Sequence, residues 1–539
     1  MSLSCSSIKT TDKNGDLSFI NKEATQWRDI PSKPIEYAPK EETIFLSGGL
    51  TLLQDKLVEA ALNSMDINFI ALPNPTFESF QKGKAYGNRG QCNPTYFTVG
   101  NLVKYLQNLR DETGLSSEEI VRKYVYITAG GCGPCRFGMY ITEYKKALRD
   151  AGFDGFRLTS FEHDKGIFQG DEIDENILNF TPKFFVTLIK AVIIGDIINL
   201  LTYKMRPYEI EKGSVDIAVE KCKEIVSQAF SDHSNLLKAM WNCRSVLEKV
   251  QLNRLQPKAK VMVMGEFWAA MTEGDGNYNL HKFLEAEGAE CIPQPIVNRL
   301  MLSIWEAEQA LKNREQLEVE DSKRIDFSNV KTKVLIKAGK AAIKTHFSLY
   351  AKAIGLHDYE IPDMDELAKL AKEYYTLECS GGEGHLEVAH LIESVKHNLA
   401  HLVISIKPFG CMPSSAVSDG VQSLVTSRYP QANFLSIETS GEGAANFYSR
   451  VQMALFKAKQ LAKEEFERSL HPKGISKGTS NDLLQSNDDK SFSDLSHKPV
   501  GQKSFAGLTP YQIEKLNNYL YQPKSEKAGT AAGLIQSLT

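Results

Sequence analysis

The sequence predicts an α/β protein built from two parallel-sheet units with a helical subdomain between them. Short apolar and β-branched runs alternate with amphipathic helical patterns over residues 42–173 and again over residues 259–468. Such alternation is typical of parallel sheets covered by helices. Residues 174–258 instead show helical periodicity throughout, which predicts the helical subdomain.

In the first unit we expect strands followed by helices, with a glycine-rich loop at 83–90 before the third strand. The expected strands are 42–46, 68–72, 124–128 and 156–161, and the expected helices are 52–65, 95–110 and 137–150.

The second unit repeats this order, with a helical insertion between its second and third strands. The expected strands are 260–264, 290–293, 402–406 and 434–437, and the expected helices are 280–287, 297–350, 364–377, 386–398, 417–427 and 446–468.

The two ends of the chain are polar. Residues 1–41 are predicted to be a disordered arm, and residues 469–539 a low-complexity tail with one short amphipathic pattern at 510–520. The apolar run 184–201 contains Lys190 and Asp196 and predicts a buried helix rather than a membrane span.

Composition excludes some classes of function. The formal net charge of −4 gives no reason to expect binding to nucleic acid or an anionic membrane. The nine cysteines in 539 residues are too sparse for a disulfide scaffold, and no secretory signal is visible, so we expect a reducing, cytoplasmic location.

Three cysteines share one local context. Each is preceded by a nearby glycine, is followed two residues later by proline, and stands where a helix is expected to begin: Cys92-Asn93-Pro94, Cys132-Gly133-Pro134 and Cys411-Met412-Pro413. Proline suits the first helical turn, and the free amides there can point at a sulfur. We therefore expect a lowered thiol pKa at the strand-to-helix corner that holds Cys132 and Cys135.

These cysteines predict an iron–sulfur cluster held between the two α/β units. The carboxyl ends of parallel strands share one edge, where ligands bind, and thiolates select soft metals. The predicted ligands are Cys92, Cys132, Cys135 and Cys411, with Cys379 as a fifth candidate and Cys291 as a weaker sixth.

Two other uses of the same thiols stay open. Four thiolates also suit a structural zinc site, although only one close pair occurs here. Strand, Cys-Gly-Pro-Cys and helix is also the local order of a thiol–disulfide exchanger that uses Cys132 and Cys135. Cys5, Cys222 and Cys243 are expected to be free or packed thiols.

Polar residues after two strands are candidates for lining the same cleft. They are Glu266 in the loop 265–279, and Glu438 and Ser440 at 438–443; the catalytic residues are otherwise unassigned. The chain has neither a GxxxxGK[ST] phosphate loop nor a GxGxxG fingerprint, so energy from ATP would have to come from another protein.

Four stretches together resemble the 2-hydroxyacyl-CoA dehydratase superfamily, and within it the acyl-CoA dehydratase activase-related branch, akin to double-cubane cluster proteins. The resemblance covers about residues 42–465 and rests on GNRGQCNPTYFTVGNLVKYL, GGCGPCRFGMYITEYKKALRDAGF, GEFWAAMTEGDGNYNLHKFL and KPFGCMPSSAVSDGVQSL. It implies two flavodoxin-like domains, a [4Fe–4S] or double-cubane [8Fe–9S] cluster between them, and an ATP-dependent activase as partner that carries its own [4Fe–4S] cluster. Cys132 and Cys411 match the family's cluster ligands best, and Cys92 and Cys135 follow.

The resemblance implies a protein that accepts low-potential electrons from the activase and reduces or dehydrates a small substrate, with an acyl-CoA as the candidate. Dehydratase subunits of the family use three cysteines. This chain offers more, which favours a fully ligated or double cluster and puts the dehydration in doubt. An electron carrier without its own substrate is the alternative, and a homodimer stays open.

Overall fold

The computed structural model describes residues 10–11, 17–18, 35–130, 135–161, 181–253, 256–318, 327–379 and 381–470. The predicted tail from residue 471 onward and most of the predicted arm lie outside the described residues. Within the arm, β1 (Thr10–Thr11) and β2 (Leu17–Ser18) form a short antiparallel pair.

The first α/β unit contains a four-stranded parallel sheet, the first sheet, in the order β4-β3-β5-β6. Its strands are β3 (Ile44–Ser47), β4 (Phe69–Ala71), β5 (Tyr124–Ala129) and β6 (Arg157–Phe161). Its helices are α1 (Leu52–Asn63), α2 (Phe77–Tyr86), α3 (Asn93–Thr113), α4 (Ser117–Lys123) and α5 (Tyr140–Asp150).

The second unit contains a parallel sheet, the second sheet, in the order β10-β9-β7-β8. Its strands are β7 (Ala259–Gly265), β8 (Ala289–Ile292), β9 (Leu402–Pro408) and β10 (Phe434–Thr439). Its helices are α9 (Phe267–Met271), α10 (Leu280–Ala286), α11 (Ile296–Glu318), α12 (Phe327–Ile354), α13 (Met364–Ala371), α14 (His385–His397), α15 (Met412–Ser415), α16 (Gln422–Arg428) and α17 (Ala444–Leu470). In both sheets the unit's first strand lies between its second and third strands. The order in which strands are added therefore changes direction at the same place in both sheets.

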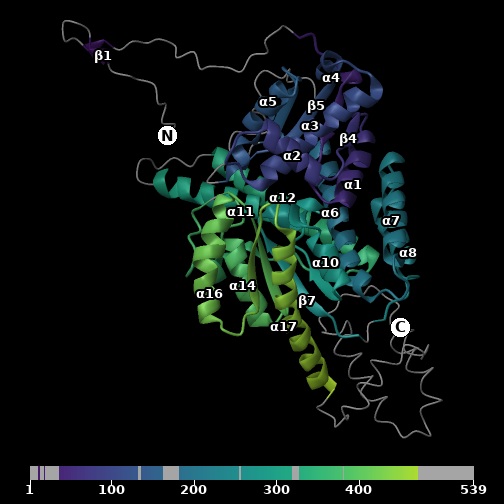
Figure 1. The fold of residues 1–539 in the computed structure, drawn as a ribbon, viewed down its shortest axis with the longest axis vertical. Helices are drawn as coiled ribbons and strands as arrows, with labels where there is room; N and C mark the ends of the chain where they lie inside the picture. Colours follow the sequence, from purple (N-terminus) through teal and green to yellow (C-terminus); the bar gives the residue numbers. More distant parts are fainter. Residues whose placement is uncertain are drawn as a thin grey trace.

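The predicted helical subdomain forms α6 (Pro182–Met205), α7 (Ser214–Ser231) and α8 (Leu236–Leu247). Figure 1 shows α6 between the two units, and it contacts both α1 and β8. Among the described residues, Pro182–Tyr208 is the one stretch long and apolar enough to cross a membrane, but 61% of its apolar window is buried inside the protein. The prediction of a buried helix is therefore confirmed.

Alternate residues of the strands enter different cores, as the two-residue period of a strand requires. On β3 and β5, Phe45 and Val125 face α1 and α6, whereas Leu46 and Tyr126 face α3 and α5. The first of these cores continues through α6 to Met262 of β7 on the second sheet. We call this continuous apolar cluster the shared core, because it joins both units.

The prediction of a glycine-rich loop at 83–90 was wrong for its first half, because α2 continues to Tyr86. Gly83 and Gly100 let α2 and α3 cross at backbone contact: a Cβ on Gly83 would lie 1.9 Å from the carbonyl oxygen of Tyr96, and one on Gly100 would lie 1.8 Å from that of Ser79. These glycines therefore serve close helix packing rather than chain reversal.

Candidate functional site

The loops that follow strands of the first sheet contact those that follow strands of the second. The Asn93 side chain at the start of α3 donates to the Thr439 carbonyl at 2.6 Å, and the Asn93 amide donates to the Phe409 carbonyl at 3.1 Å. At the start of α1, the Leu52 amide donates to the Glu273 carboxylate at 2.8 Å. The carboxyl edges of both sheets therefore meet, and ligands bind at such edges in α/β proteins.

The turns that carry Cys92 and Cys411 touch each other at this junction. Gly410, at φ 78°, lies against the main chain of the other turn, and a Cβ there would be 3.1 Å from the Gln91 carbonyl oxygen and 3.2 Å from the Cys92 Cα. Cys92 is 6% exposed and Cys411 is 7% exposed. Two cysteines more than 300 residues apart in sequence are thus brought to one buried place.

Cys135 reaches the same place from the end of β5. Its thiol accepts a hydrogen bond from the Phe137 amide at 3.5 Å. The expectation of a lowered thiol pKa is wrong for Cys135. Burial, assisted by the nearby Glu266 and Glu383 carboxylates and by Cys92, outweighs that amide and raises the pKa of Cys135 to about 11. Cys132, the other predicted ligand of this corner, lies outside the described residues.

Hydroxyl groups surround the other two thiols. The Cys92 thiol lies 3.1 Å from the Thr95 hydroxyl and 3.2 Å from the Tyr140 hydroxyl. Burial, assisted by Glu266, is also the main reason that the pKa of Cys411 is raised, and it outweighs the opposite effect of the neighbouring Ser414. A predicted amide donor at a helix start is therefore present at Cys135, whereas the Cys411 side chain accepts no capping hydrogen bond at the start of α15.

A carboxylate pair that the sequence only half revealed accompanies these thiols. Burial and the neighbouring Glu383 raise the pKa of Glu266 to about 8, despite the Ala269 amide that donates to it at 2.8 Å. Burial also raises the pKa of Glu383, which Arg299 opposes at 3.8 Å. Glu266 acts on the pKa of Cys135 and Cys411, so it is a neighbour common to both.

Glu143 holds the turn that precedes Cys92. Its carboxylate is 3% exposed and accepts from the Asn88 amide at 3.1 Å, the Asn88 side chain at 2.8 Å and the Gln91 side chain at 3.0 Å. A buried carboxylate saturated by one turn fixes that turn's conformation. Sequence reasoning missed Glu143, because it stands inside an amphipathic helix pattern.

Cys379, the predicted fifth ligand, lies at the edge of this group. Its thiol hydrogen-bonds Tyr375 and, after burial, is the main reason that the pKa of that tyrosine is raised to about 12. Its turn reaches Cys411 through Gly382, where a Cβ would lie 2.8 Å from the Pro413 side chain.

The remaining cysteines of the described residues lie elsewhere. Cys291 is buried within the second sheet, where its thiol contacts the His281 carbonyl at 3.8 Å, so the weak sixth candidate is not part of this group. Cys222 and Cys243 are wholly buried free thiols that contact each other's carbonyl at 3.7 Å, as expected for packed thiols.

The other two cleft candidates follow β10. Glu438 is exposed at the end of that strand. The Ser440 hydroxyl donates to the Glu442 carbonyl and lies 3.3 Å from the Tyr278 hydroxyl, so it already closes its own turn. Neither residue is among the groups that shift the pKa of the Cys135 or Cys411 thiol.

Within the described ranges, which omit Cys132, no three or more His, Cys, Asp or Glu side chains form a ready metal-binding group. No family model matches the chain, and no curated protein matches it.

Proposed function

We propose that this chain is an iron–sulfur protein that accepts low-potential electrons from an ATP-dependent activase and passes them to a small substrate, with an acyl-CoA as the candidate. The cofactor would be a [4Fe–4S] or double-cubane cluster held by Cys92, Cys132, Cys135 and Cys411, with Cys379 at its edge. Such a cluster would supply one-electron transfer at low potential.

One observation carries this proposal: the turns of Cys92 and Cys411, from different α/β units, are in main-chain contact beside Cys135. Packing alone gives no reason to gather three thiols from remote parts of the chain. Thiolates in a buried setting are the donor set that iron–sulfur clusters take. The residues fit the group in donor type, and the contact between the turns of Cys92 and Cys411 supports their sharing it.

The surrounding residues have definable roles in this proposal. The Phe137 amide donates a hydrogen bond to the Cys135 sulfur, which would stabilise negative charge there. With its pKa near 8, Glu266 holds a proton at neutral pH and could deliver it beside the thiols.

Exposed apolar side chains lie on the cysteine turns, where we propose that the activase docks. Three large apolar side chains on these turns are more than half exposed: Met139, Phe409 and Met412. Exposed apolar side chains beside a buried site are typical of protein contact surfaces. They support docking of the activase at this face.

The finer fold assignment is also part of the proposal. Both sheets have the strand order of a flavodoxin-like domain, with the switch in direction between the first and third strands. Cys135 and Cys411 follow the third strand of their units, and Glu266 follows the first strand of its own. We place the protein in the cytoplasm, where thiols stay reduced.

Iron and sulfide analysis of protein purified without oxygen tests the proposal. We expect a brown protein with at least about four irons per chain, and an EPR signal on reduction. Cys92→Ser and Cys411→Ser should lose most of the iron. Cys291→Ala, a buried cysteine outside the group, is the matched control and should keep it. A colourless, iron-free chain would end the proposal.

The same variants separate the remaining functions. A thiol–disulfide exchanger would reduce insulin disulfides, and Cys92→Ser and Cys411→Ser would leave that activity intact. An electron carrier would be reduced by the activase but would neither bind nor convert an acyl-CoA. A reductase should bind the acyl-CoA when reduced.

A further inference from the structure

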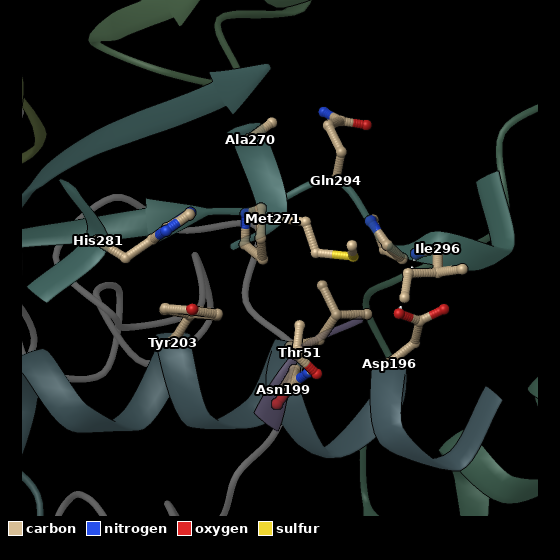
Figure 2. Close-up of a pocket in the computed structure, with 12 residues that line it drawn as sticks. Thr51, Asp196, Asn199, Tyr203, Ala270, Met271, His281, Gln294 and Ile296 are labelled. Atoms are coloured by element: carbon tan, nitrogen blue, oxygen red, sulfur yellow. Dashed lines mark hydrogen bonds between the residues drawn. The ribbon is translucent and has the colours of Figure 1, made fainter. Parts of the chain in front are cut away.

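A small cavity lies where α6 meets α9, α10 and the connection between β8 and α11. Its volume is about 20 Å³, and Figure 2 shows the side chains around it. The polar and sulfur-containing side chains that line it include Thr51, Asp196, Asn199, Tyr203, Met271 and His281.

On one side of the cavity the polar groups are fully paired. Asp196 accepts hydrogen bonds from the Ile296 and Val297 amides at 2.9 and 2.8 Å, and from the Gln54 side chain at 2.8 Å. Asn199 donates to the Thr51 hydroxyl at 2.8 Å. These groups hold the wall of the cavity and do not themselves require a ligand.

The opposite side carries an unpaired histidine. His281 is 4% exposed, lines the cavity, and has no hydrogen-bond partner for either ring nitrogen among the described residues. Its ring centroid lies 5.1 Å from that of Tyr203, which is 5% exposed. A buried polar group without a hydrogen-bond partner lowers stability, so native structures rarely leave one.

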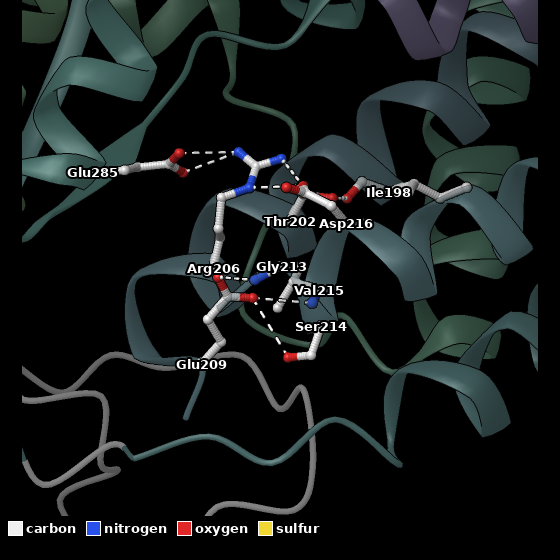
Figure 3. A network of polar contacts seen from close by, with 9 residues as sticks. All are labelled: Ile198, Thr202, Arg206, Glu209, Gly213, Ser214, Val215, Asp216 and Glu285. Carbon is white, nitrogen blue, oxygen red and sulfur yellow. Dashed lines mark hydrogen bonds and ion pairs between the residues drawn. The ribbon is translucent and has the colours of Figure 1, made fainter. Parts of the chain in front are cut away.

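The charge state of His281 limits what it can bind. Burial and the nearby Arg206 guanidinium lower the pKa of His281 to about 4, so the ring is neutral at physiological pH, with one donor and one acceptor nitrogen. Arg206 is fixed in place by Glu285 at 3.0 Å and Asp216 at 2.7 Å (Figure 3). A neutral ring with one donor and one acceptor matches an uncharged hydrogen-bonding molecule.

We propose that the cavity is a binding site for one uncharged, water-sized molecule, and that water is the resident ligand, hydrogen-bonded to a ring nitrogen of His281. The volume of about 20 Å³ suits a single water, which needs roughly 10–15 Å³. Buried waters of this kind satisfy polar groups that the chain itself leaves unpaired.

A crystal structure of the whole chain at a resolution that shows ordered water tests this directly. We expect a peak in the cavity about 2.7–3.2 Å from a His281 ring nitrogen. An empty cavity overturns the proposal, and so does a His281 ring that bonds directly to protein groups.

Two substitutions at His281 give an independent test, because their effects on folding stability depend on whether a water is bound. His281→Leu removes both ring nitrogens, and His281→Gln keeps a donor and an acceptor. With a resident water, His281→Leu should lower the folding equilibrium constant about tenfold more than His281→Gln. Equal losses contradict the proposal. A gain in stability for His281→Leu also contradicts it, since removing an unsatisfied ring would relieve a cost.

Discussion

The contact between the Cys92 and Cys411 turns can be tested by placing one methyl group between them. In Gly410→Ala the alanine would have to adopt the glycine's φ of 78°. Its Cβ would lie 3.1 to 3.4 Å from three main-chain atoms of Gln91 and Cys92. The left-handed conformation costs a non-glycine residue about 1–2 kcal/mol. Overpacking at a close contact adds about 1–3 kcal/mol.

A matched control separates these two costs. Gly443 has nearly the same φ, 80°, but a Cβ there would meet no atom within 4 Å. Gly443→Ala should therefore cost only about 1–2 kcal/mol, the conformational part.

Urea unfolding of both variants, prepared without oxygen, measures the difference. We expect Gly410→Ala to lose at least about 1 kcal/mol more than Gly443→Ala. Under the proposed function it should also lose iron, whereas Gly443→Ala should keep it. Equal unfolding free energies for the two variants would contradict the expected cost of this contact.

Three further outcomes are expected. Gly100→Ala should lower the free energy of unfolding by about 2 kcal/mol or more, because its Cβ meets backbone at 1.8 Å; Gly339→Ala on α12, which meets nothing within 4 Å, should be neutral or stabilising in the same urea titration. Asp196→Asn should flatten the pH dependence of the free energy of unfolding. Burial raises the Asp196 pKa from 3.8 to about 7, so the stabilisation that Asp196 provides is complete below pH 4 and is lost as pH rises through 7. The loss relative to the variant is at most about 4 kcal/mol. If the stability of the unchanged chain relative to Asp196→Asn rose with pH, this sign would be wrong. Glu143→Gln should loosen the turn before Cys92, which hydrogen exchange of the Asn88 amide would report as faster exchange; unchanged exchange would mean that the carboxylate does not hold the turn.

The strands were predictable from the sequence because each is a short apolar run next to glycine or polar residues. All eight expected strands of the two sheets form within two residues of the predicted bounds. The loop predicted at Gly83 was wrong, because glycine occurs both in turns and where helices cross closely. Only the three-dimensional packing of α2 on α3 distinguishes the two cases.

The candidate site was predictable in its thiols but not in its carboxylates. The spacing of cysteine, proline and glycine pointed to Cys92, Cys132 and Cys411, since helix starts leave a local signature, and the Cys-x-x-Cys pair added Cys135. Glu143 and Glu383 have no such signature. The raised pKa of Cys135 could not be foreseen either, because burial and the approach of Glu266 depend on the second unit.

The shared core restricts how this molecule can move. In many two-domain proteins a ligand enters when the halves swing apart about a linker. Here the apolar cluster that runs from Phe45 through α6 to Met262 would have to be exposed to water for such a swing. We therefore expect a ligand to reach the cysteines through local rearrangement of the surface turns, and the two halves to unfold together in one transition.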